Sequence, residues 1–584
     1  MKGGDIFNRE PFAACLSREF KKKESMMTIR KLLPMLLVVF FTITCFLIVP
    51  RSGLAAGIEI IDHQYKLTTL VNDAPLAGVN GATIGQDGAL YVVHTGNGTV
   101  SRIDLKTMKI NTFVPSYAGI SISDDITADD KGNLFVTGTT PLVGKVYRIN
   151  KNRLKTVIAS GLKAPNGIQY NKRTGRLFMS ECFQGNRVFE LDPTGVKQPR
   201  LLVAENIIPV PEGFDFDPDT NDLIIPDLGS GKILRVHPDT GKITTIAEKF
   251  VTPVALKIGP DKRAYIVELA TGGVYRLTLD GRKREKLAQL MPGLDNLAIT
   301  SDGSLYVTSY WDATIFKVAT DGTGKYKTLF PMGANQINGI LIKNNQVLIA
   351  DAIMVRRVEK GKYIKTKLNA WASHGMPLPL GLADGPGDQV FWCDVVNNAV
   401  AVGNPATGKF KLVAGGLDRP MAMQMSKDQT KLFVAEYGAG RITEISLKDG
   451  AKKALASGLE GPLALTIVDN MLYVAEAKIG RISRIDPSTG KKEVFLNGIV
   501  GKPGALGHDE AGNLLVLDGD SQRLFRVGTK DLAISVVAKN VPVSYGSVGS
   551  YPPIEFPLSM SVSAKGDIYI ATMNRGVIML RKVE

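Results

Sequence analysis

Cysteine is scarce in this chain of 584 residues, which contains four. Cys15 and Cys45 lie in the N-terminal region, and Cys182 and Cys393 fall in different halves of the remaining chain. A scaffold held by disulfides needs paired, closely patterned cysteines, so this distribution argues against a disulfide framework. Neither Cys182 nor the nearby Ser180 has an evident base beside it, and nucleophilic catalysis therefore lacks support.

Histidine is almost as rare, with five residues. His63, His237, His374 and His508 show none of the spacings at which histidines bind a metal from one strand or helix. The sequence therefore does not predict a histidine-based metal centre. The fifth histidine, His94, occupies a repeated position that is described below.

Basic stripes and low-complexity tracts are also absent. The formal net charge is +15, but lysines and arginines are scattered and no run interleaves them with aromatic residues, which argues against a nucleic-acid partner. The 60 glycines and 30 prolines are dispersed at turns, so the whole repeated region is predicted to fold.

Only one long hydrophobic run is present, at residues 32–49. Basic residues precede it between positions 21 and 31, and small residues follow it between positions 53 and 56. This length lies between that of a signal-peptide core and that of a membrane-spanning helix. Residues 1–56 are therefore predicted to be a signal peptide or a membrane anchor, and both alternatives place the rest of the chain outside the cytoplasm.

A β-meander unit recurs through the rest of the chain. In one copy, Gly167 to Tyr170 is a short strand, Asn171 to Gly175 a polar turn, and Arg176 to Ser180 a second strand. The bulky residue in the middle of the second strand, Phe178 in this copy, recurs about every 40 to 50 residues, the period of four-stranded propeller blades. Its equivalents are Tyr91, Phe135, Phe178, Ile224, Tyr265, Tyr306, Leu348, Phe391, Phe433, Tyr473, Leu515 and Tyr569.

Twelve units predict two propellers, because single propellers usually have four to eight blades. The expected fold is all-β, with consecutive six-bladed propellers at residues 57–322 and 323–584 after an N-terminal hydrophobic helix. The last unit lacks a fourth strand, so a strand from the N-terminal side is expected to complete each ring. Tyr65 to Leu70 would close the first propeller and Tyr326 to Phe330 the second, although a division into seven and five blades stays open.

The start of each inner strand points toward the propeller axis, and alignment of the units assigns one such residue to each blade. Five of the six in the first propeller carry side-chain oxygens, and three are carboxylates. Carboxylates that converge on one axis repel one another, and a hard divalent cation such as Ca²⁺ would relieve this repulsion. The six residues are Asn80, Asp124, Asn166, Glu212, Val254 and Asp295.

The same position in the second propeller is nearly apolar. The fold places the same demands on both rings, so it does not by itself explain the polar one. The alternative is that Asn, Asp and Glu only satisfy turn amides at strand starts. An expanded loop at residues 539–557 is predicted to cover this second mouth as a plug, or else to line a site for an apolar ligand. The second ring holds Asn338, Leu380, Met421, Leu463, Gly504 and Leu558.

The ends of the second strands lie on the same face as these rings. Because acidic residues recur there in both propellers, we expect them to brace the adjacent turns. His94 differs, since it is the only histidine at this position, and it is a candidate proton relay near neutral pH. A histidine with purely structural contacts is the alternative. The residues are His94, Glu181, Asp227, Glu268, Asp351, Asp394, Glu436, Glu476 and Asp518.

Two short motifs carry a family resemblance. Ala164 to Gly167 (APNG) and Pro211 to Phe214 (PEGF), with GxLYV-type second strands, resemble the gluconolactonase and senescence-marker-protein family of six-bladed propellers, and more loosely NHL-repeat and strictosidine-synthase-like proteins. The resemblance implies an axial divalent metal, held by a Glu, two Asn and an Asp, that activates lactone or ester substrates. Asn166 matches the Asn of the family's PNG motif, and Glu212 stands where the family has Asp.

The other metal-ligand positions implied by the resemblance hold different residue types in this chain. Asp124 falls where the resemblance implies a second Asn, Asn80 falls where it implies the Glu, and Asp295 is additional. The resulting hypothesis is a metal-dependent lactonase or esterase, in which these five ring residues hold the metal and His94, Glu212 and Asp295 are the catalytic candidates. The alternative is a non-catalytic NHL-like scaffold that binds protein or polysaccharide, and a lyase or synthase on the same fold also stays open.

Overall fold

The computed structural model describes residues 57–583, except for 73, 96–97, 116–119, 121–122, 139–143, 335–336, 352–353, 370–378, 396, 499, 544–559 and 573–575. The predicted hydrophobic helix lies outside these residues, as does most of the predicted plug loop. Where the structure is described, no helix has the length and apolar character needed to cross a membrane.

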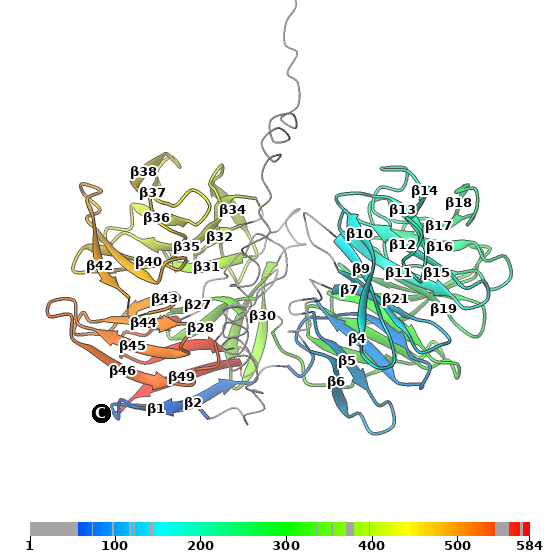
Figure 1. Ribbon diagram of the computed structural model, residues 1–584, viewed down its shortest axis with the longest axis horizontal. Helices are drawn as coiled ribbons and strands as arrows, with labels where there is room; N and C mark the ends of the chain where they lie inside the picture. The colour runs from blue at the N-terminus through cyan, green and yellow to red at the C-terminus, as the bar shows by residue number, and fades with distance from the viewer. Residues whose placement is uncertain are drawn as a thin grey trace, which may run out of the picture. The chain divides into compact units, whose positions relative to one another are not determined.

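The all-β prediction is confirmed for the described residues, whose regular elements are strands in twelve antiparallel sheets (Figure 1). The first six sheets have four strands each. In chain order they are β3 (Val79–Ile84), β4 (Leu90–His94), β5 (Val100–Ile103) and β6 (Ile110–Val114); β7 (Ser123–Ala128), β8 (Leu134–Gly138), β9 (Gly144–Ile149) and β10 (Lys155–Leu162); β11 (Pro165–Asn171), β12 (Arg176–Glu181), β13 (Val188–Leu191) and β14 (Arg200–Val203); β15 (Asp215–Phe216), β16 (Leu223–Asp227), β17 (Lys232–Val236) and β18 (Ile243–Ala247); β19 (Pro253–Ile258), β20 (Ala264–Glu268), β21 (Gly273–Leu277) and β22 (Arg284–Gln289); and β23 (Leu294–Ile299), β24 (Leu305–Ser309), β25 (Thr314–Val318) and β26 (Tyr326–Thr328).

The other six sheets follow in the chain, and two of them also take up N-terminal strands. Their own strands are β27 (Ile337–Lys343), β28 (Gln346–Asp351), β29 (Met354–Glu359) and β30 (Lys362–Asn369); β31 (Pro379–Asp384), β32 (Val390–Asp394), β33 (Ala399–Gly403) and β34 (Phe410–Ala414); β35 (Pro420–Met425), β36 (Lys431–Glu436), β37 (Arg441–Ser446) and β38 (Lys452–Ser457); β39 (Pro462–Val468), β40 (Met471–Glu476), β41 (Arg481–Ile485) and β42 (Lys492–Asn497); β43 (Pro503–His508), β44 (Leu514–Asp518), β45 (Arg523–Val527) and β46 (Ile534–Lys539); and β47 (Met560–Val562), β48 (Ile568–Thr572) and β49 (Gly576–Lys582).

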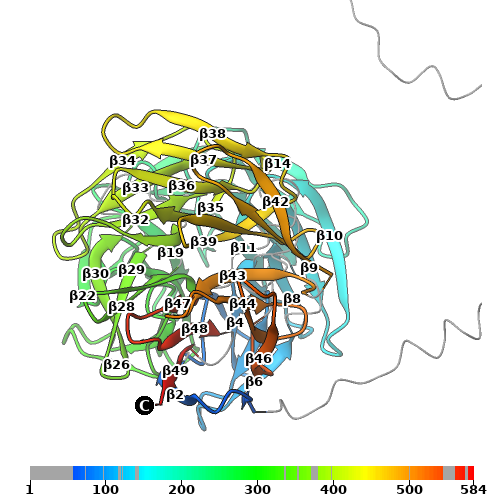
Figure 2. The ribbon, with the colours of Figure 1, turned by 90° about the vertical axis from the view of Figure 1, so that its left-hand side faces the viewer.

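The inner strands contact one another in two closed rings of six blades. In the first ring β3 lies between β7 and β23, while β11 contacts β7 and β19 contacts both β15 and β23. In the second ring β27 lies between β31 and β47, and β35, β39 and β43 complete the circle (Figure 2). The inner strands approach closely: a side chain at Gly167 would bring its Cβ to 2.7 Å from the carbonyl oxygen of Glu212 in the next blade. The glycine of the APNG motif is therefore a packing requirement of the ring.

The strands that complete the rings differ from those predicted. The N-terminal strand β2 (Tyr65–Val71) pairs antiparallel with β49, and β1 (Glu59–Ile60) pairs with β46, so both belong to the second propeller. The segment predicted to close the second propeller instead forms β26 and pairs with β25 of the first. Both predicted closures were wrong, and the boundary predicted between residues 322 and 323 falls in the turn of the β25–β26 hairpin. In the chain, the first propeller (β3–β26) thus stands between β1 and β2, which are outer strands of the second propeller, and the remaining strands of the second propeller (β27–β49).

The core lies between neighbouring blades. Second strands such as β4, β20 and β44 are buried along their whole length, because each is covered by a blade on both faces. Phe178 packs against Phe216 of the next blade, with ring centroids 5.6 Å apart. The first and sixth blades close the first ring through a shared apolar cluster that includes Leu76, Tyr306 and Phe330. Side-chain packing between adjacent blades closes the first ring. In the second ring, the N-terminal strands β1 and β2 also pair with strands of two blades.

Candidate functional site

The acidic residues at the ends of the second strands brace the turns beside them, as predicted. Glu181 accepts a hydrogen bond from the backbone N–H of Lys163 at 2.7 Å, and Asp227 accepts one from Val210 at 2.9 Å. Glu268, Glu436, Glu476 and Asp518 do the same for the loops before their neighbouring inner strands. Buried loop amides need such partners, so these carboxylates are structural parts of the blade.

Glu212 lies just before β15, and Asn80, Asp124, Asn166 and Asp295 lie near the starts of β3, β7, β11 and β23. The pairing register of β3, β7, β11 and β23 is interrupted at these residues, which places them in bulges. A bulge turns a side chain out of the regular alternation of the strand. The inner strands of the second propeller carry the same irregularity, so the polarity of the first ring is not a requirement of the bulge.

Two of the ring residues are joined by a direct hydrogen bond. The side-chain amide of Asn80 donates to Asp124 Oδ1 at 2.6 Å and to Thr95 Oγ1 at 3.1 Å. Asn166 also hydrogen-bonds to the Asp124 carboxyl group. The structure therefore brings Asn80, Asp124 and Asn166 together from three consecutive blades.

The carboxyl groups of the ring are close enough to repel one another. Burial, and then the charge of Asp125, raises the pKa of Asp124 to about 7. Burial raises the pKa of Glu212 well above its ordinary value, and the charges of Asp124 and Asp295 raise it further. The pKa of Asp295 is raised by burial and then by Asp124. These groups must either stay protonated near neutral pH or gain a positive charge close by.

The chemistry of the donor set suits a hard cation, because carboxylate and amide oxygens are the ligands that Ca²⁺ prefers. Within the described residues, however, no group of three or more His, Cys, Asp or Glu side chains is arranged to hold a metal ion. The side-chain amide of Asn80 is directed at Asp124 through its nitrogen. The metal assignment of Asn80, Asp124, Asn166, Glu212 and Asp295 therefore stays a prediction.

His94 has partners on both ring nitrogens. Nδ1 donates to the carbonyl oxygen of Ala77 at 2.7 Å, and Nε2 lies 2.9 Å from Ser101 Oγ, which donates to it. The side chain is buried, and burial lowers its pKa. These contacts match the structural alternative for His94, and they provide no free nitrogen for a proton relay.

Cys182 lies beside the ring, a position that the sequence did not reveal. Burial raises the pKa of its thiol well above the ordinary value, and the charges of Glu212, Asp124 and Asp295 add to this effect. A thiol with a raised pKa carries little thiolate at neutral pH and is a weak nucleophile. The absence of support for nucleophilic catalysis by Cys182 therefore agrees with its surroundings.

A second layer of buried polar residues continues along the inner strands below the ring. Asp125 accepts hydrogen bonds from the side-chain amide of Asn296 at 2.9 Å and from the backbone N–H of Ile168 at 3.1 Å. The Lys257 ammonium group donates to Gln169 Oε1 at 2.8 Å.

The Gln169 amide in turn donates to Asp215 at 3.1 Å. Lys257 is 6% exposed, and its charge lowers the pKa values of Asp125 and Asp215, which burial raises. It is the counter-charge of two buried carboxyl groups.

Sequence reasoning missed this layer, although two signals were present. Asp125 directly follows a ring residue, and Lys257 interrupts the otherwise apolar strand β19, which reads PVALKI. A lysine in a buried strand predicts a buried partner.

The apolar character of the second ring agrees with the prediction. Leu380, Met421 and Leu463 are fully buried in one core cluster. Asn338, the single polar member, is also buried, and its side-chain nitrogen has no hydrogen-bond partner among the described residues. Leu558 lies outside the described residues.

We predict that the metal-free protein loses stability as pH rises from about 4 to about 7. The folded-state pKa of Asp124 lies above its ordinary value of 3.8, so folding favours the protonated form, and the stability present at low pH is lost as the group ionises. The loss is expected to be roughly 2 to 4 kcal/mol. Thermal unfolding in EDTA across this pH range measures it, and Asp124→Asn should flatten the profile. An unchanged slope in that variant would assign the effect to other groups.

Comparison with known proteins places the chain near two groups of propeller proteins. No family model matches it. It has weak sequence homology to a gluconolactonase of Zymomonas mobilis, at 23% identity over 170 residues, and to strictosidine synthase-like protein 3 of Arabidopsis thaliana, at 23% over 174 residues. These alignments cover 25% and 26% of this chain and 48% and 44% of the relatives. The chain thus spans less than half the length of the curated relatives it matches.

Two solved structures align with this chain at low TM-scores. A protein assigned as a gluconolactonase is 14% identical, with a TM-score of 0.35, and the match covers 47% of this chain and 99% of that one. A chain of a nidogen/laminin complex is 19% identical, with a TM-score of 0.34, and the match covers 38% and 85% of the two chains. Scores this low carry no argument about function. The predicted resemblance to gluconolactonase and strictosidine-synthase-like proteins is confirmed as a weak homology.

Proposed function

We propose that the axial mouth of the first propeller binds a divalent cation and hydrolyses a lactone or ester. The oxygen ligands of the site favour Ca²⁺. The observation that carries this proposal is the convergence of Asp124, Glu212 and Asp295, whose pKa values are raised by burial and by neighbouring carboxylates, with Asp124 acting on both Glu212 and Asp295. A protein gains nothing in stability from burying like charges together. Such an arrangement is a candidate for function when its groups lie where a ligand can meet them.

Each part of the site has a role in the proposed reaction. Asp124, Glu212 and Asp295 supply carboxylate oxygens to the cation, and Asn80 and Asn166 orient Asp124. A bound cation would polarise the substrate carbonyl and stabilise the negative charge that develops on its oxygen. Glu212 would accept the proton of the attacking water through the carboxylate oxygen that does not bind the cation. We assign no step to His94, since both its ring nitrogens are bonded.

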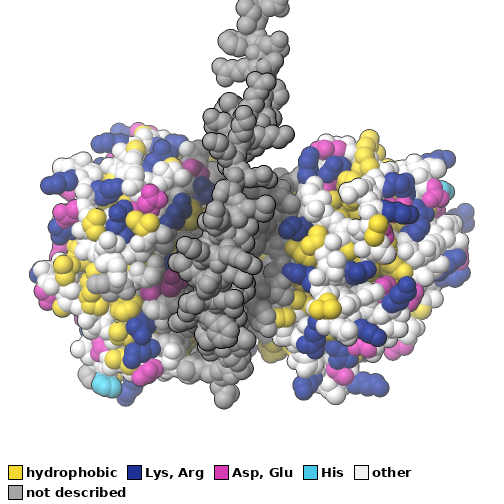
Figure 3. Space-filling view, in the orientation of Figure 1, with side chains coloured by type: hydrophobic (Ala, Val, Ile, Leu, Met, Phe, Trp, Pro, Cys, Tyr) yellow, Lys and Arg dark blue, Asp and Glu magenta, His cyan; other side chains and the backbone are white. Residues whose placement is uncertain are grey.

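The setting of the reaction follows from the rest of the chain. The hydrophobic run at residues 32–49 is the basis for proposing that the propellers lie outside the cytoplasm, secreted, periplasmic or anchored to a membrane. On the face in Figure 3, lysines and arginines lie among aspartates and glutamates. This mixed surface is consistent with a small-molecule substrate and offers no extended basic stripe for nucleic acid.

The test is hydrolysis of gluconolactone and p-nitrophenyl acetate by the chain from residue 57 onward, which contains the compact unit Ile58–Glu584. EDTA should abolish activity and added Ca²⁺ should restore it. Glu212→Gln should lower kcat/KM by about 100-fold, the usual effect of removing a general base. Glu205→Gln is the matched control, because its carboxylate is exposed at the surface. Activity that resists EDTA would remove the metal from the mechanism.

A non-catalytic scaffold is the second candidate, and two observations favour it. No metal-site arrangement is formed among the described carboxylates, and His94 is structurally engaged. In a scaffold the cation would be structural, and blade surfaces would bind protein or polysaccharide. A rise in Tm with Ca²⁺, without turnover of any lactone or ester, would support this function over hydrolysis.

A further inference from the structure

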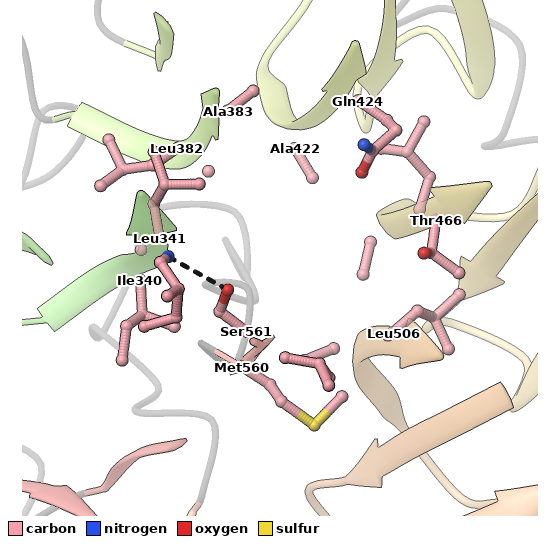
Figure 4. Close-up of a pocket in the computed structure, with 18 of the residues that line it drawn as sticks. Ile340, Leu341, Leu382, Ala383, Ala422, Gln424, Thr466, Leu506, Met560 and Ser561 are labelled. Atoms are coloured by element: carbon pink, nitrogen blue, oxygen red, sulfur yellow. Dashed lines mark hydrogen bonds between the residues drawn. The ribbon is translucent and has the colours of Figure 1, made fainter. Parts of the chain in front are cut away.

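The second propeller contains a cavity along its axis. It has a volume of about 420 Å³ and is lined by all six inner strands, β27, β31, β35, β39, β43 and β47 (Figure 4). This volume falls in the range of small-molecule sites, roughly 300 to 1,000 Å³. Leu380, Met421 and Leu463 of the apolar ring directly precede lining residues and are fully buried.

The two propellers carry different side chains at corresponding axial positions. Three residues after the ring position, the first propeller carries Gln169, Asp215 and Lys257, whose long or charged side chains form the buried network described above. Two of the six corresponding positions in the second propeller carry clearly smaller side chains, Ala383 in place of Thr127 and Gly507 in place of Lys257, and a cavity lies there. A glycine in place of a lysine leaves space near the axis.

Most of the side chains in the wall are aliphatic, but polar atoms contribute more than half of its exposed surface. Ile340, Leu382, Ala422 and Leu506 surround the space, and Gln424 and Thr466 lie on one side of it (Figure 4). Thr466 Oγ1 also lies 3.3 Å from His508 Nδ1. Specific small-molecule sites commonly combine apolar walls with a small number of fixed polar groups.

One polar group in this lining has no hydrogen-bond partner in the part of the chain that the structure describes. Asn338 lines the cavity and is 2% exposed, and its side-chain Nδ2 has no hydrogen-bond partner among the described residues. A buried donor without an acceptor raises the free energy of the folded protein. A ligand oxygen that accepts from Nδ2 would offset this cost.

Charged residues at the rim of the cavity are already neutralised. Lys343 pairs with Asp384, and the Asp509 and Glu510 carboxylates pair with Arg526 and Lys582 at 3.0 and 2.7 Å. Each of these rim charges is therefore already paired with an opposite charge and is not available to an ionic ligand. An uncharged ligand would enter without breaking them.

We propose that this cavity binds an uncharged small molecule with an aliphatic or alicyclic body and a carbonyl oxygen that accepts a hydrogen bond from Asn338. The site is separate in the chain from the carboxylate ring of the first propeller and needs no metal. The apolar body lies against Ile340, Leu382 and Leu506, while Gln424 and Thr466 offer polar contacts along one side.

The probe is 2-decanone, which carries a carbonyl group that a hydrolase cannot cleave. Isothermal titration in the presence of EDTA should give saturable binding of one molecule per chain. Decanoate and decyltrimethylammonium, which have similar bodies and opposite charges, should bind at least tenfold more weakly. Because the probe is neither a substrate nor a metal ligand, a failed hydrolase assay and a failed binding assay are separate results.

Two substitutions locate the site. Ala422→Phe fills the cavity and should abolish binding, whereas Ala451→Phe, at an exposed turn, should leave it unchanged. Asn338→Leu keeps a similar volume and removes the unpaired donor. It should weaken 2-decanone binding about tenfold, the value of one lost hydrogen bond, without lowering the Tm of the ligand-free protein.

The outcomes separate the proposal from its alternatives. Unchanged binding in a folded Ala422→Phe variant would place the ligand elsewhere, and equal binding of the charged probes would indicate non-specific adsorption. No saturable binding of 2-decanone overturns the proposal outright. Should Ala422→Phe fail to fold, unchanged affinity in Asn338→Leu still overturns it, because the donor is the specific feature of the site.

Discussion

Deletion of residues 58–71 is expected to unfold the second propeller and to leave the first folded. The deletion removes β2, which pairs with β49 from Tyr65 opposite Lys582 to Val71 opposite Val577. It also removes Tyr65 and Val71 from two apolar clusters of the second propeller. The bare edge of β49 would then be exposed. Each buried side chain that is removed costs about 1.5 to 3 kcal/mol, and the lost β2–β49 hydrogen bonds add to this. The total approaches the whole free energy of unfolding of a domain.

Calorimetry and limited proteolysis measure this effect. The intact chain should protect both propellers, and the truncated chain should yield a protease-resistant fragment near residues 74–330 while residues 337–583 are degraded. Restoring the same residues after the C-terminus through a flexible linker should recover the second propeller, because the strand needs only to reach β49. Loss of the first propeller in the truncated chain would contradict the observed strand pairing.

Lys257→Met is expected to destabilise the first propeller by about 1.5 to 3 kcal/mol, the usual contribution of a hydrogen bond to a charged group. The substitution keeps the apolar stem of the side chain and removes the ammonium group that donates to Gln169. Asp125 and Asp215 would then lack the charge that lowers their pKa values. Chemical denaturation of the first propeller provides the measurement.

The matched control is Lys262→Met, because Lys262 pairs with Asp219 at the surface, where both side chains are largely exposed. An exposed pair of this kind is expected to contribute less than about 1 kcal/mol. A second control, Lys257→Met combined with Asp125→Asn and Asp215→Asn, should recover part of the lost stability, since the uncompensated charges are gone. Equal effects of Lys257→Met and Lys262→Met would show that Lys257 does not neutralise the buried carboxyl groups.

The repeat, the blade architecture and the axial ring were predictable because each depends on local pattern. Phe178 and its equivalents mark the buried second strands, and the residue at each inner-strand start is fixed by its distance from them. The sequence therefore predicts Asp124 and Glu212 in one ring. Periodicity in a propeller converts sequence position directly into a place around the axis.

Ring closure could not be assigned from the same pattern. Tyr65 to Leu70 and Tyr326 to Phe330 both read as isolated strands, and either could complete a ring. The second forms a hairpin with β25 because a short turn joins them, with Ala319 hydrogen-bonded to the carbonyl oxygen of Lys325. A short loop costs less entropy to close than a long connection does. β2 was then left to pair with β49, which has no outer strand of its own.

The polar layer below the ring was missed for a different reason. Asp125 and Lys257 come from strands far apart in the sequence, and each would have been assigned to the surface by residue type alone. Their pairing depends on how six inner strands converge, which no local window contains. Asn338 was likewise an exception in a nearly apolar ring by sequence, and only the structure shows that its side-chain nitrogen has no partner among the described neighbours.

The central claim is that the carboxylates of the first axial ring bind a divalent cation. Calorimetric titration of Ca²⁺ into the chain from residue 57 onward, compared with the Asp124→Asn, Asp295→Asn double variant, tests it most directly. The account predicts one ion per chain in the unaltered protein and none at the same concentrations in the double variant. Absence of binding in the unaltered protein, or equal binding in both, would contradict it.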